Sequence, residues 1–394
     1  MRNTRRMSLA FSLLAATGLL AAGCSSDDSE VSSGGSSSSA PAGGAGANCP
    51  KDVKIGFFGA LTGSDAALGL NERNGVKVAL DRYKKESGCE VKLEEYDSQG
   101  EPAQAPALAS KAVTDKNVVA IIGPAFSGES KTANPIFNEG GLPIITPSAT
   151  NAALSKNGWK IFHRAVANDD LQGPAAAKFI LGKGAKKVAV IDDASEYGKG
   201  LADIVRTELR EGGATTDVNE AIDPKGSDYS STVNKVKAAN VDAVFYGGYY
   251  ESAGRLMKQL RDGNVAATFV AGDGSLDIKF LDSAGGKGEG AVLLAPGAYT
   301  ASDQSFVDDY KRLNSGAEPG LYSVEGFDAA NHVLAAIKAG KTVRADINAY
   351  ISSTPYQGLL KNYQYQADGE LQGGGDIIVH EVKSGKINLV GPVK

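Results

Sequence analysis

Three histidines, three cysteines and one tryptophan are found among the 394 residues, and no motif of a common catalytic centre is present. The chain has no G-x-S-x-G turn for a serine nucleophile, no H-E-x-x-H zinc motif and no phosphate-binding P-loop. His163, His332 and His380 stand in no recognisable nucleophile or metal motif. We therefore expect no enzyme, no cofactor and no metal site, and a secreted hydrolase is kept only as the least favoured hypothesis.

Long apolar runs are also missing. The charge-free segment 7–22 contains serine, threonine and glycine and falls short of the roughly 20 apolar residues of a membrane-spanning helix. Three arginines precede it, which is the layout of an export signal. The sequence LAAGC at 20–24 resembles the lipobox of bacterial lipoproteins, where the cysteine is acylated. We expect residues 1–23 to be removed and Cys24 to hold the protein on the cell membrane; the alternative is a plain secretory signal followed by a chance cysteine.

Residues 24–48 have almost no large apolar side chains and consist mainly of Ser, Gly, Ala and Asp. Such a composition cannot bury a core, so a flexible tether is expected. About 345 residues follow from Cys49 onward, which is more than one compact core usually serves, and two lobes are therefore expected.

Basic charge is in deficit as well. The net charge is −5, and removal of the predicted signal takes away three arginines and no acid, which brings it to −8. Neither value suggests a nucleic acid as a partner.

Cys49 and Cys89 each lie just before a strand-like run, and an exported protein can keep them oxidised. A disulfide between them is predicted, with two unrelated buried thiols as the alternative.

Short β-rich runs alternate with helical patterns from residue 53 to residue 273, which predicts a parallel sheet with helices on both faces. The rhythm restarts after Asp169, so two doubly wound lobes with a cleft between the carboxyl ends of their strands are expected. Leu201, Val205 and Leu209 mark the buried face of one amphipathic helix. Two helical stretches are predicted over 303–352, and a terminal hairpin over 377–391.

Several stretches together resemble the leucine/isoleucine/valine-binding proteins of ABC importers. The resemblance extends, in order, from residue 53 to the end, and it is carried by VKIGFFGALTG (53–63), IIGPAFSGES (121–130), IITPSATN (144–151), SEYGKGLAD (195–203), VFYGGYYESAG (244–254) and FVAGDGS (269–275). It implies a type I periplasmic binding protein: an α/β fold of two Rossmann-like lobes joined by a three-strand hinge. The expected lobes are 49–168 plus about 298–376, and 169–297 plus about 377–394.

The same resemblance implies a monomeric receptor that binds a branched-chain or related amino acid in the cleft between the lobes and presents it to the membrane subunits of an ABC permease. Its first half-site would consist of Ser127, Ser148, Ala149 and Thr150, whose hydroxyl and N–H groups suit the ligand carboxylate. Tyr197, Tyr249 and Asp273 would come from the second lobe. For a single Ser or Thr, a helix cap or turn is the ordinary role.

Two positions depart from the family pattern. Asp273 stands where relatives commonly have a glutamate that accepts the ligand ammonium, and Leu68 stands where better-known relatives have a tyrosine. The departures keep a second hypothesis open: a receptor of the same build for an amide or another small polar solute, or one that serves a sensor. Tyr322 and Glu325 are further candidates for the cleft.

Overall fold

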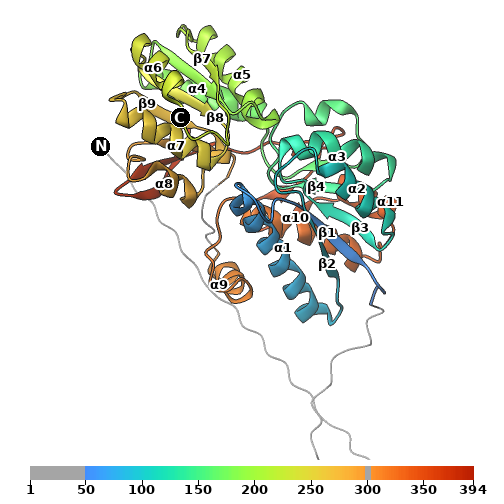
Figure 1. Cartoon of the computed structure of the whole chain (residues 1–394). Helices are drawn as coiled ribbons and strands as arrows, with labels where there is room; N and C mark the ends of the chain where they lie inside the picture. The colour runs from blue at the N-terminus through green and yellow to red at the C-terminus, as the bar shows by residue number, and fades with distance from the viewer. Residues whose placement is uncertain (1–48, 298–302) are drawn as a thin grey trace, which may run out of the picture. The chain divides into compact units, whose positions relative to one another are not determined.

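The computed structural model describes residues 49–297 and 303–394 (Figure 1). The predicted signal, the predicted acylation site Cys24 and the predicted tether lie outside these residues. Two main sheets are present, and in Figure 1 the helices gather around each of them. No helix of the described ranges is long and apolar enough to cross a membrane.

The first sheet has five parallel strands in the order β2-β1-β3-β4-β5. Its central strand β3 is buried along its whole length, as expected when helices cover both faces. The strands are β1 (Lys54–Gly59), β2 (Lys92–Asp97), β3 (Val118–Ile122), β4 (Ile144–Thr146) and β5 (Phe162–Arg164).

Six helices accompany this sheet. They are α1 (Ala66–Ser87), α2 (Ala105–Thr114), α3 (Ser127–Glu139), α9 (Gln304–Leu313), α10 (Ser323–Lys338) and α11 (Arg344–Ser353). Helices α1 and α10, which are more than 200 residues apart in sequence, pack directly against each other. Glycine makes this approach possible: a Cβ at Gly75 of α1 would lie only 1.9 Å from the carbonyl oxygen of Ser323.

The second sheet has seven strands in the order β14-β13-β10-β9-β8-β6-β7. Five strands are parallel, and β13 and β14 add an antiparallel hairpin beside β10. The strands are β6 (Val188–Asp192), β7 (Asn219–Ala221), β8 (Ala243–Gly247), β9 (Thr268–Ala271), β10 (Val292–Ala295), β13 (Ile378–Lys383) and β14 (Lys386–Pro392).

Five helices accompany the second sheet: α4 (Asp169–Gly182), α5 (Glu196–Glu211), α6 (Ser230–Ala239), α7 (Tyr250–Asp262) and α8 (Ile278–Ala284). Leu201, Val205 and Leu209 of α5 are all fully buried, as their spacing predicts. The remaining elements are short: η1 (Leu154–Asn157), η2 (Asp273–Ser275) and the small pair β11 (Tyr356–Gln357) and β12 (Asn362–Tyr363).

The predicted α/β class and the terminal hairpin are confirmed, and the hairpin is now seen to extend the second sheet. The prediction of two helical stretches over 303–352 is wrong, because three helices are present. Helix α10 ends at Lys338 with Ala339 as its C-cap, and Gly340 follows with a φ of 81°, a left-handed conformation that stops a helix readily. Strands β5 and β10 were not predicted as strands.

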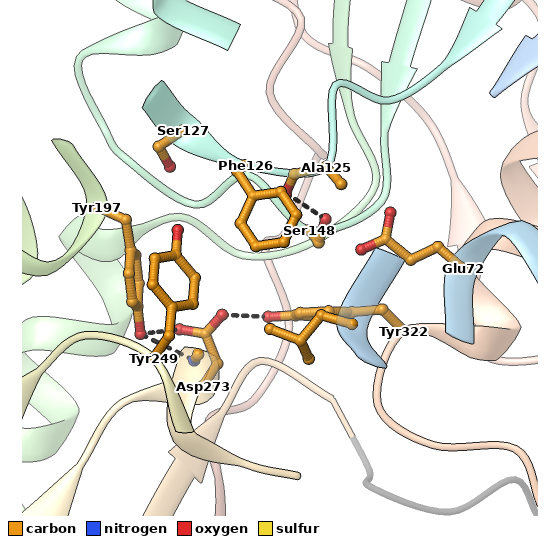
Figure 2. Close-up of a pocket in the computed structure, with 11 residues that line it drawn as sticks. Glu72, Ala125, Phe126, Ser127, Ser148, Tyr197, Tyr249, Asp273 and Tyr322 are labelled. Atoms are coloured by element: carbon orange, nitrogen blue, oxygen red, sulfur yellow. Dashed lines mark hydrogen bonds between the residues drawn. The ribbon is translucent and has the colours of Figure 1, made fainter. Parts of the chain in front are cut away.

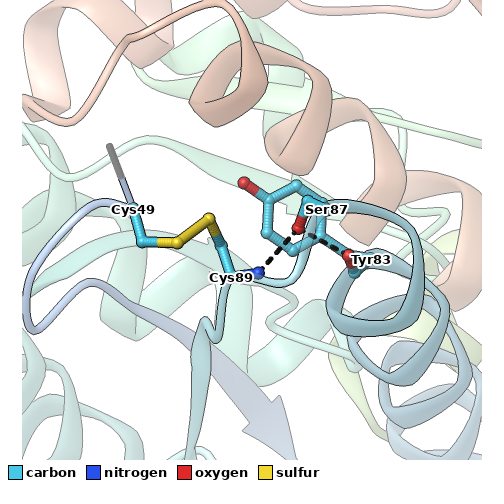
Figure 3. The surroundings of a disulfide bond; sticks show 4 residues. All are labelled: Cys49, Tyr83, Ser87 and Cys89. Carbon is cyan, nitrogen blue, oxygen red and sulfur yellow. Dashed lines mark hydrogen bonds between the residues drawn. A yellow bond between two sulfur atoms is a disulfide. The ribbon is translucent and has the colours of Figure 1, made fainter. Parts of the chain in front are cut away.

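The predicted disulfide between Cys49 and Cys89 is present (Figure 3), with Cα atoms 5.2 Å apart. It joins the chain ahead of β1 to the chain ahead of β2, and these two strands are neighbours in the first sheet. On the Cys89 side, the backbone N–H of Cys89 donates to the hydroxyl of Ser87, which donates in turn to the carbonyl of Tyr83.

Candidate functional site

A pocket lies where loops from both sheets meet, at the carboxyl ends of their strands (Figure 2). We call it the inner pocket. The loop after β3 and the start of α3 form one side, and the segments after β8 and β9 form the other. Its lining residues are Leu68, Glu72, Ala125, Phe126, Ser127, Ser148, Tyr197, Tyr249, Asp273, Gly274 and Tyr322.

Asp273 is the charged centre of the second-sheet side, and its side chain is buried. One carboxylate oxygen accepts hydrogen bonds from the Gln172 amide at 2.7 Å and the Tyr197 hydroxyl at 2.7 Å. The other accepts from the Tyr322 hydroxyl at 2.6 Å. Burial raises the pKa of the Asp273 carboxyl, and these three donors oppose the shift. A carboxylate has about four acceptor positions, so one remains for a further donor.

Aromatic rings form the wall beside this carboxylate. The ring centroids of Phe126 and Tyr249 are 5.3 Å apart in an edge-to-face arrangement, and those of Tyr197 and Tyr249 are also 5.3 Å apart. Phe126 comes from the first-sheet side, whereas both tyrosines come from the second-sheet side. The rings therefore close the pocket with contacts that cross between the two sides.

Ser127 is the first residue of the 13-residue helix α3, and its side chain is buried in the pocket. Its hydroxyl oxygen accepts a hydrogen bond from the backbone N–H of Asn151 at 3.2 Å. The free N–H groups of a helix N-terminus attract negative charge, and here they lie beside that hydroxyl. This side of the pocket can therefore receive an anionic group.

The predicted first-lobe residues divide into two groups. Ser127 and Ser148 line the pocket, whereas Ala149 and Thr150 are buried next to it without lining it. The Ser148 hydroxyl donates to the carbonyl of Ala125 at 2.6 Å. The backbone carbonyl of Thr150 accepts from the N–H of Asp169 at 2.9 Å, which connects the loop to the start of α4.

A buried arginine that the sequence analysis missed supports this loop. Arg164, at the end of β5, has a fully buried side chain and forms two hydrogen bonds with the Glu370 carboxylate, at 2.7 and 3.2 Å. It also donates to the backbone carbonyls of Ala149 at 2.6 Å and Asn151 at 2.9 Å. No local signal identifies the pair, because Arg164 and Glu370 are 206 residues apart in sequence.

Glu72 is a second missed residue, and it brings another carboxyl group into the pocket. It follows Leu68 by one helical turn, so the two share a face of α1, and this spacing is the signal that could have identified it. Burial raises the pKa of the Glu72 carboxyl well above its ordinary value, with the nearby Ser148 hydroxyl opposing the shift. Among the described residues that line the pocket, none is a cationic side chain that would oppose this shift of the pKa.

The two further candidates have different outcomes. Tyr322 lines the pocket and binds Asp273, whereas Glu325 is buried in α10 and does not line it. Burial raises the pKa of the Glu325 carboxyl to about 7.

The lining side chains of the inner pocket leave a volume of only about 10 Å³, roughly that of one water molecule. An amino acid could enter only if the two sides of the pocket moved apart.

The described part of the chain contains no group of three or more His, Cys, Asp or Glu residues placed to bind a metal ion. The polar groups of the inner pocket are instead hydroxyls, amide donors and two carboxyls. Such a set can bind a small polar molecule by hydrogen bonds and charge.

Comparison with known proteins agrees with this architecture. The sequence profile of the periplasmic binding protein family matches residues 52–386. The Leu/Ile/Val-binding protein BraC3 of Rhizobium johnstonii is 38% identical over 243 residues, which are 60% of this chain and 66% of that protein, so the match spans slightly less than two thirds of that relative. An amino acid binding protein of Pseudomonas aeruginosa is 30% identical over 84% of this chain and 90% of its own length.

Among solved structures, the branched-chain amino acid transporter substrate binding protein LivJ from Streptococcus pneumoniae, in complex with isoleucine, superposes with a TM-score of 0.77. It is 26% identical, and the superposition covers 86% of this chain and 99% of that one. The family implies an extracytoplasmic location. From the profile match, these relatives and the shared fold, the chain belongs to the periplasmic binding protein family, in the group of leucine/isoleucine/valine-binding proteins.

Proposed function

We propose that this protein is the solute receptor of an ABC importer and that it binds a branched-chain or closely related amino acid in the inner pocket. The observation that carries the proposal is the position of the Asp273 carboxylate and the N-terminus of α3 in one pocket, beside aromatic rings. An α-amino acid needs an acceptor for its ammonium and donors for its carboxylate close to each other, because both groups are attached to the same carbon atom. Asp273 would accept the ammonium, while Ser127 and the α3 N–H groups would bind the carboxylate.

The remaining residues would have supporting roles in this proposal. Tyr197 and Tyr249 would contact the aliphatic side chain, and Leu68 would supply apolar surface opposite them. Ser148, Ala149 and Thr150 would fix the loop that faces the ligand carboxylate. The lobes would comprise 49–168 plus about 298–376, and 169–297 plus about 377–394. Closure of these lobes over the ligand would create the shape that the permease recognises.

Thermal unfolding of the fragment from Cys49 onward tests this proposal. The fragment is first unfolded and refolded to remove bound ligand, and is then heated with each common amino acid and a few amides. A ligand at about 100 times its Kd stabilises the folded protein by roughly 2.7 kcal/mol. A rise in Tm with leucine, isoleucine or valine supports the proposal, and no rise with any amino acid rejects it.

An amide or another neutral polar solute is the second candidate, and the Glu72 carboxyl favours it. A protonated carboxyl can donate to an amide oxygen, while Asp273 accepts from the amide nitrogen. The amides in the same panel separate the two candidates. Because an amide has neither an ammonium nor a carboxylate, a rise in Tm with an amide supports the second candidate.

We also propose that Cys24 is acylated and that the receptor is attached to the cell membrane. The composition of residues 1–48 supports this. Expression of the full chain in its host, followed by fractionation and mass spectrometry of the amino-terminal peptide, tests the attachment. Cys24→Ser should release the protein from the membrane fraction, and a variant that stays bound would contradict the proposal.

A further inference from the structure

A second and larger cavity lies next to the inner pocket, on the other side of Phe126 and Tyr249. We call it the outer chamber. Its volume is about 630 Å³, and the two aromatic residues line both cavities, so they form the wall between them. Loops of both sheets contribute to it, from Ser64 and Gln99 on one side to Asp193 and Pro224 on the other.

The charged side chains of the outer chamber do not balance. Five carboxylates and three cationic side chains line it. Each cation pairs with one carboxylate: Lys131 with Glu196 at 2.9 Å, Lys225 with Glu101 at 2.6 Å and Arg255 with Glu251 at 3.2 Å. Asp65 and Asp193 are the two carboxylates of the chamber that no described cation pairs with.

Asp193 is almost completely buried, with 3% of its surface exposed. One carboxylate oxygen accepts from the backbone N–H of Ser195 at 2.9 Å. The other is buried and accepts no hydrogen bond within residues 49–297 and 303–394. An unsatisfied carboxylate oxygen in such a place is costly, which indicates that a donor from outside the chain can complete it.

Asp65 is half-buried and precedes α1. Its carboxylate accepts from the neighbouring Ser64 hydroxyl at 3.1 Å. Burial raises the pKa of the Asp65 carboxyl to about 7, and the negative charge of Asp193 adds to the shift. The two carboxylates therefore act on each other within one chamber, and a positive charge between them would relieve their repulsion.

The walls indicate what kind of cation fits. A small metal ion would need a cluster of oxygen ligands, and the described residues contain no such cluster. Here two carboxylates share a chamber with the rings of Phe126 and Tyr249. Aromatic faces attract alkylammonium and guanidinium groups and also contact their hydrocarbon parts. We propose that the outer chamber is a binding site for an organic cation, with Asp193 and Asp65 as its charge partners.

Two sources could supply this group. One is a free alkylamine that binds beside an amino acid in the inner pocket. The other is the side chain of a basic amino acid whose α-ammonium lies at Asp273, and this second source rests on the proposed function. Because Phe126 and Tyr249 separate the cavities, the second source requires that the two rings part.

Calorimetric titration of the fragment from Cys49 onward tests the site at constant ionic strength. Butylammonium chloride probes the free amine, sodium chloride at equal concentration is the blank, and lysine is compared with norleucine, which has the same chain without the ammonium. Each titration is repeated with Asp193→Asn. Asp192→Asn is the matched control, because it removes the same charge from the neighbouring residue, whose carboxylate faces Arg206 at 4.0 Å.

Butylammonium binding that Asp193→Asn weakens by about ten-fold or more, with little effect of Asp192→Asn, supports the site and a free amine. Lysine binding that exceeds norleucine binding, and loses its advantage in Asp193→Asn, supports the site and a basic side chain. Equal affinity of both probes for wild type and Asp193→Asn, or no binding of either, overturns it. Tm and leucine binding of each variant report folding and the inner pocket separately, so a failed outer site leaves the proposed function standing.

Discussion

The two sides of the inner pocket are built from different kinds of group. The first-sheet side presents a helix N-terminus, the Ser127 and Ser148 hydroxyls and the Glu72 carboxyl, whose pKa burial raises well above its ordinary value. A buried guanidinium behind this side fixes the loop at Ala149. The second-sheet side presents one carboxylate, Asp273, with phenol and amide donors around it. Backbone and hydroxyl groups suit an anion, and a carboxylate suits a cation, so the pocket is polarised along the line between its sides.

The two sides also differ in what keeps them in place. The first-sheet side depends on an ion pair between Arg164 and Glu370 that is distant in sequence. On the second-sheet side, Asp273 is held by neutral donors, which are the Gln172 amide and the Tyr197 and Tyr322 hydroxyls, and these also lie 49 to 101 residues away in sequence. We therefore expect substitutions in the ion pair behind the first-sheet side to act mainly on stability. Substitutions of residues that line the inner pocket should act mainly on affinity.

The largest expected effect is that of Arg164→Met on stability. It leaves the Glu370 carboxylate without its partner and removes two donors from the loop at 149–151, so the free energy of unfolding should fall by about 3–5 kcal/mol. Urea denaturation measures it. Lys84→Met, which breaks an exposed pair with Glu90, is the control and should leave stability almost unchanged. An equally small effect of Arg164→Met would show that the ion pair is not what supports this loop.

Next is the disulfide, which is tested by replacing both Cys49 and Cys89 with serine. The bond closes a loop between residues 40 apart in sequence, and its loss should cost about 2–4 kcal/mol of stability. Because the bond lies at the start of β1 and β2, away from the pocket, leucine affinity at a temperature where the variant is folded should stay the same. A loss of affinity in the folded variant would contradict the separation of stability from binding.

Asp273→Asn should have the largest effect on affinity. It removes the charge that would face the ligand ammonium in a buried pocket, which corresponds to about 1.5–3 kcal/mol, or roughly 10- to 100-fold in Kd. Calorimetry with the amino acid found in the thermal panel measures the change. Asp192→Asn provides the charge-matched control, and wild-type affinity of Asp273→Asn would exclude Asp273 as the ammonium partner.

Ser127→Ala should have the smallest effect of the four. It removes one neutral hydroxyl from the side of the pocket that would bind the ligand carboxylate, and it leaves the α3 N–H groups in place. Binding should therefore weaken by about 0.5–1.5 kcal/mol. Ser230→Ala is the control, since Ser230 also begins a helix, α6, but does not line the pocket. If Ser127→Ala cost more affinity than Asp273→Asn, the assignment of the two ends would have to be reversed.

Local patterns in the sequence predict the doubly wound sheets and most residues of the inner pocket. Alternating strand and helix periodicities predicted the doubly wound sheets, because burial of apolar side chains imposes those periodicities. Five of the seven predicted ligand-binding residues line the inner pocket, since strand ends in parallel sheets meet at one edge. Whether these residues bind the ligand as predicted stays a proposal.

Only the tertiary structure decided which distant residues meet. Glu370 reaches Arg164, Tyr322 reaches Asp273, and Glu72 turns into the pocket from α1. Periodicity reports which face of an element is buried, but not which partner buries it, because that depends on how the helices and sheets pack. The tertiary structure also decides that the cations of the outer chamber pair with carboxylates other than Asp65 and Asp193.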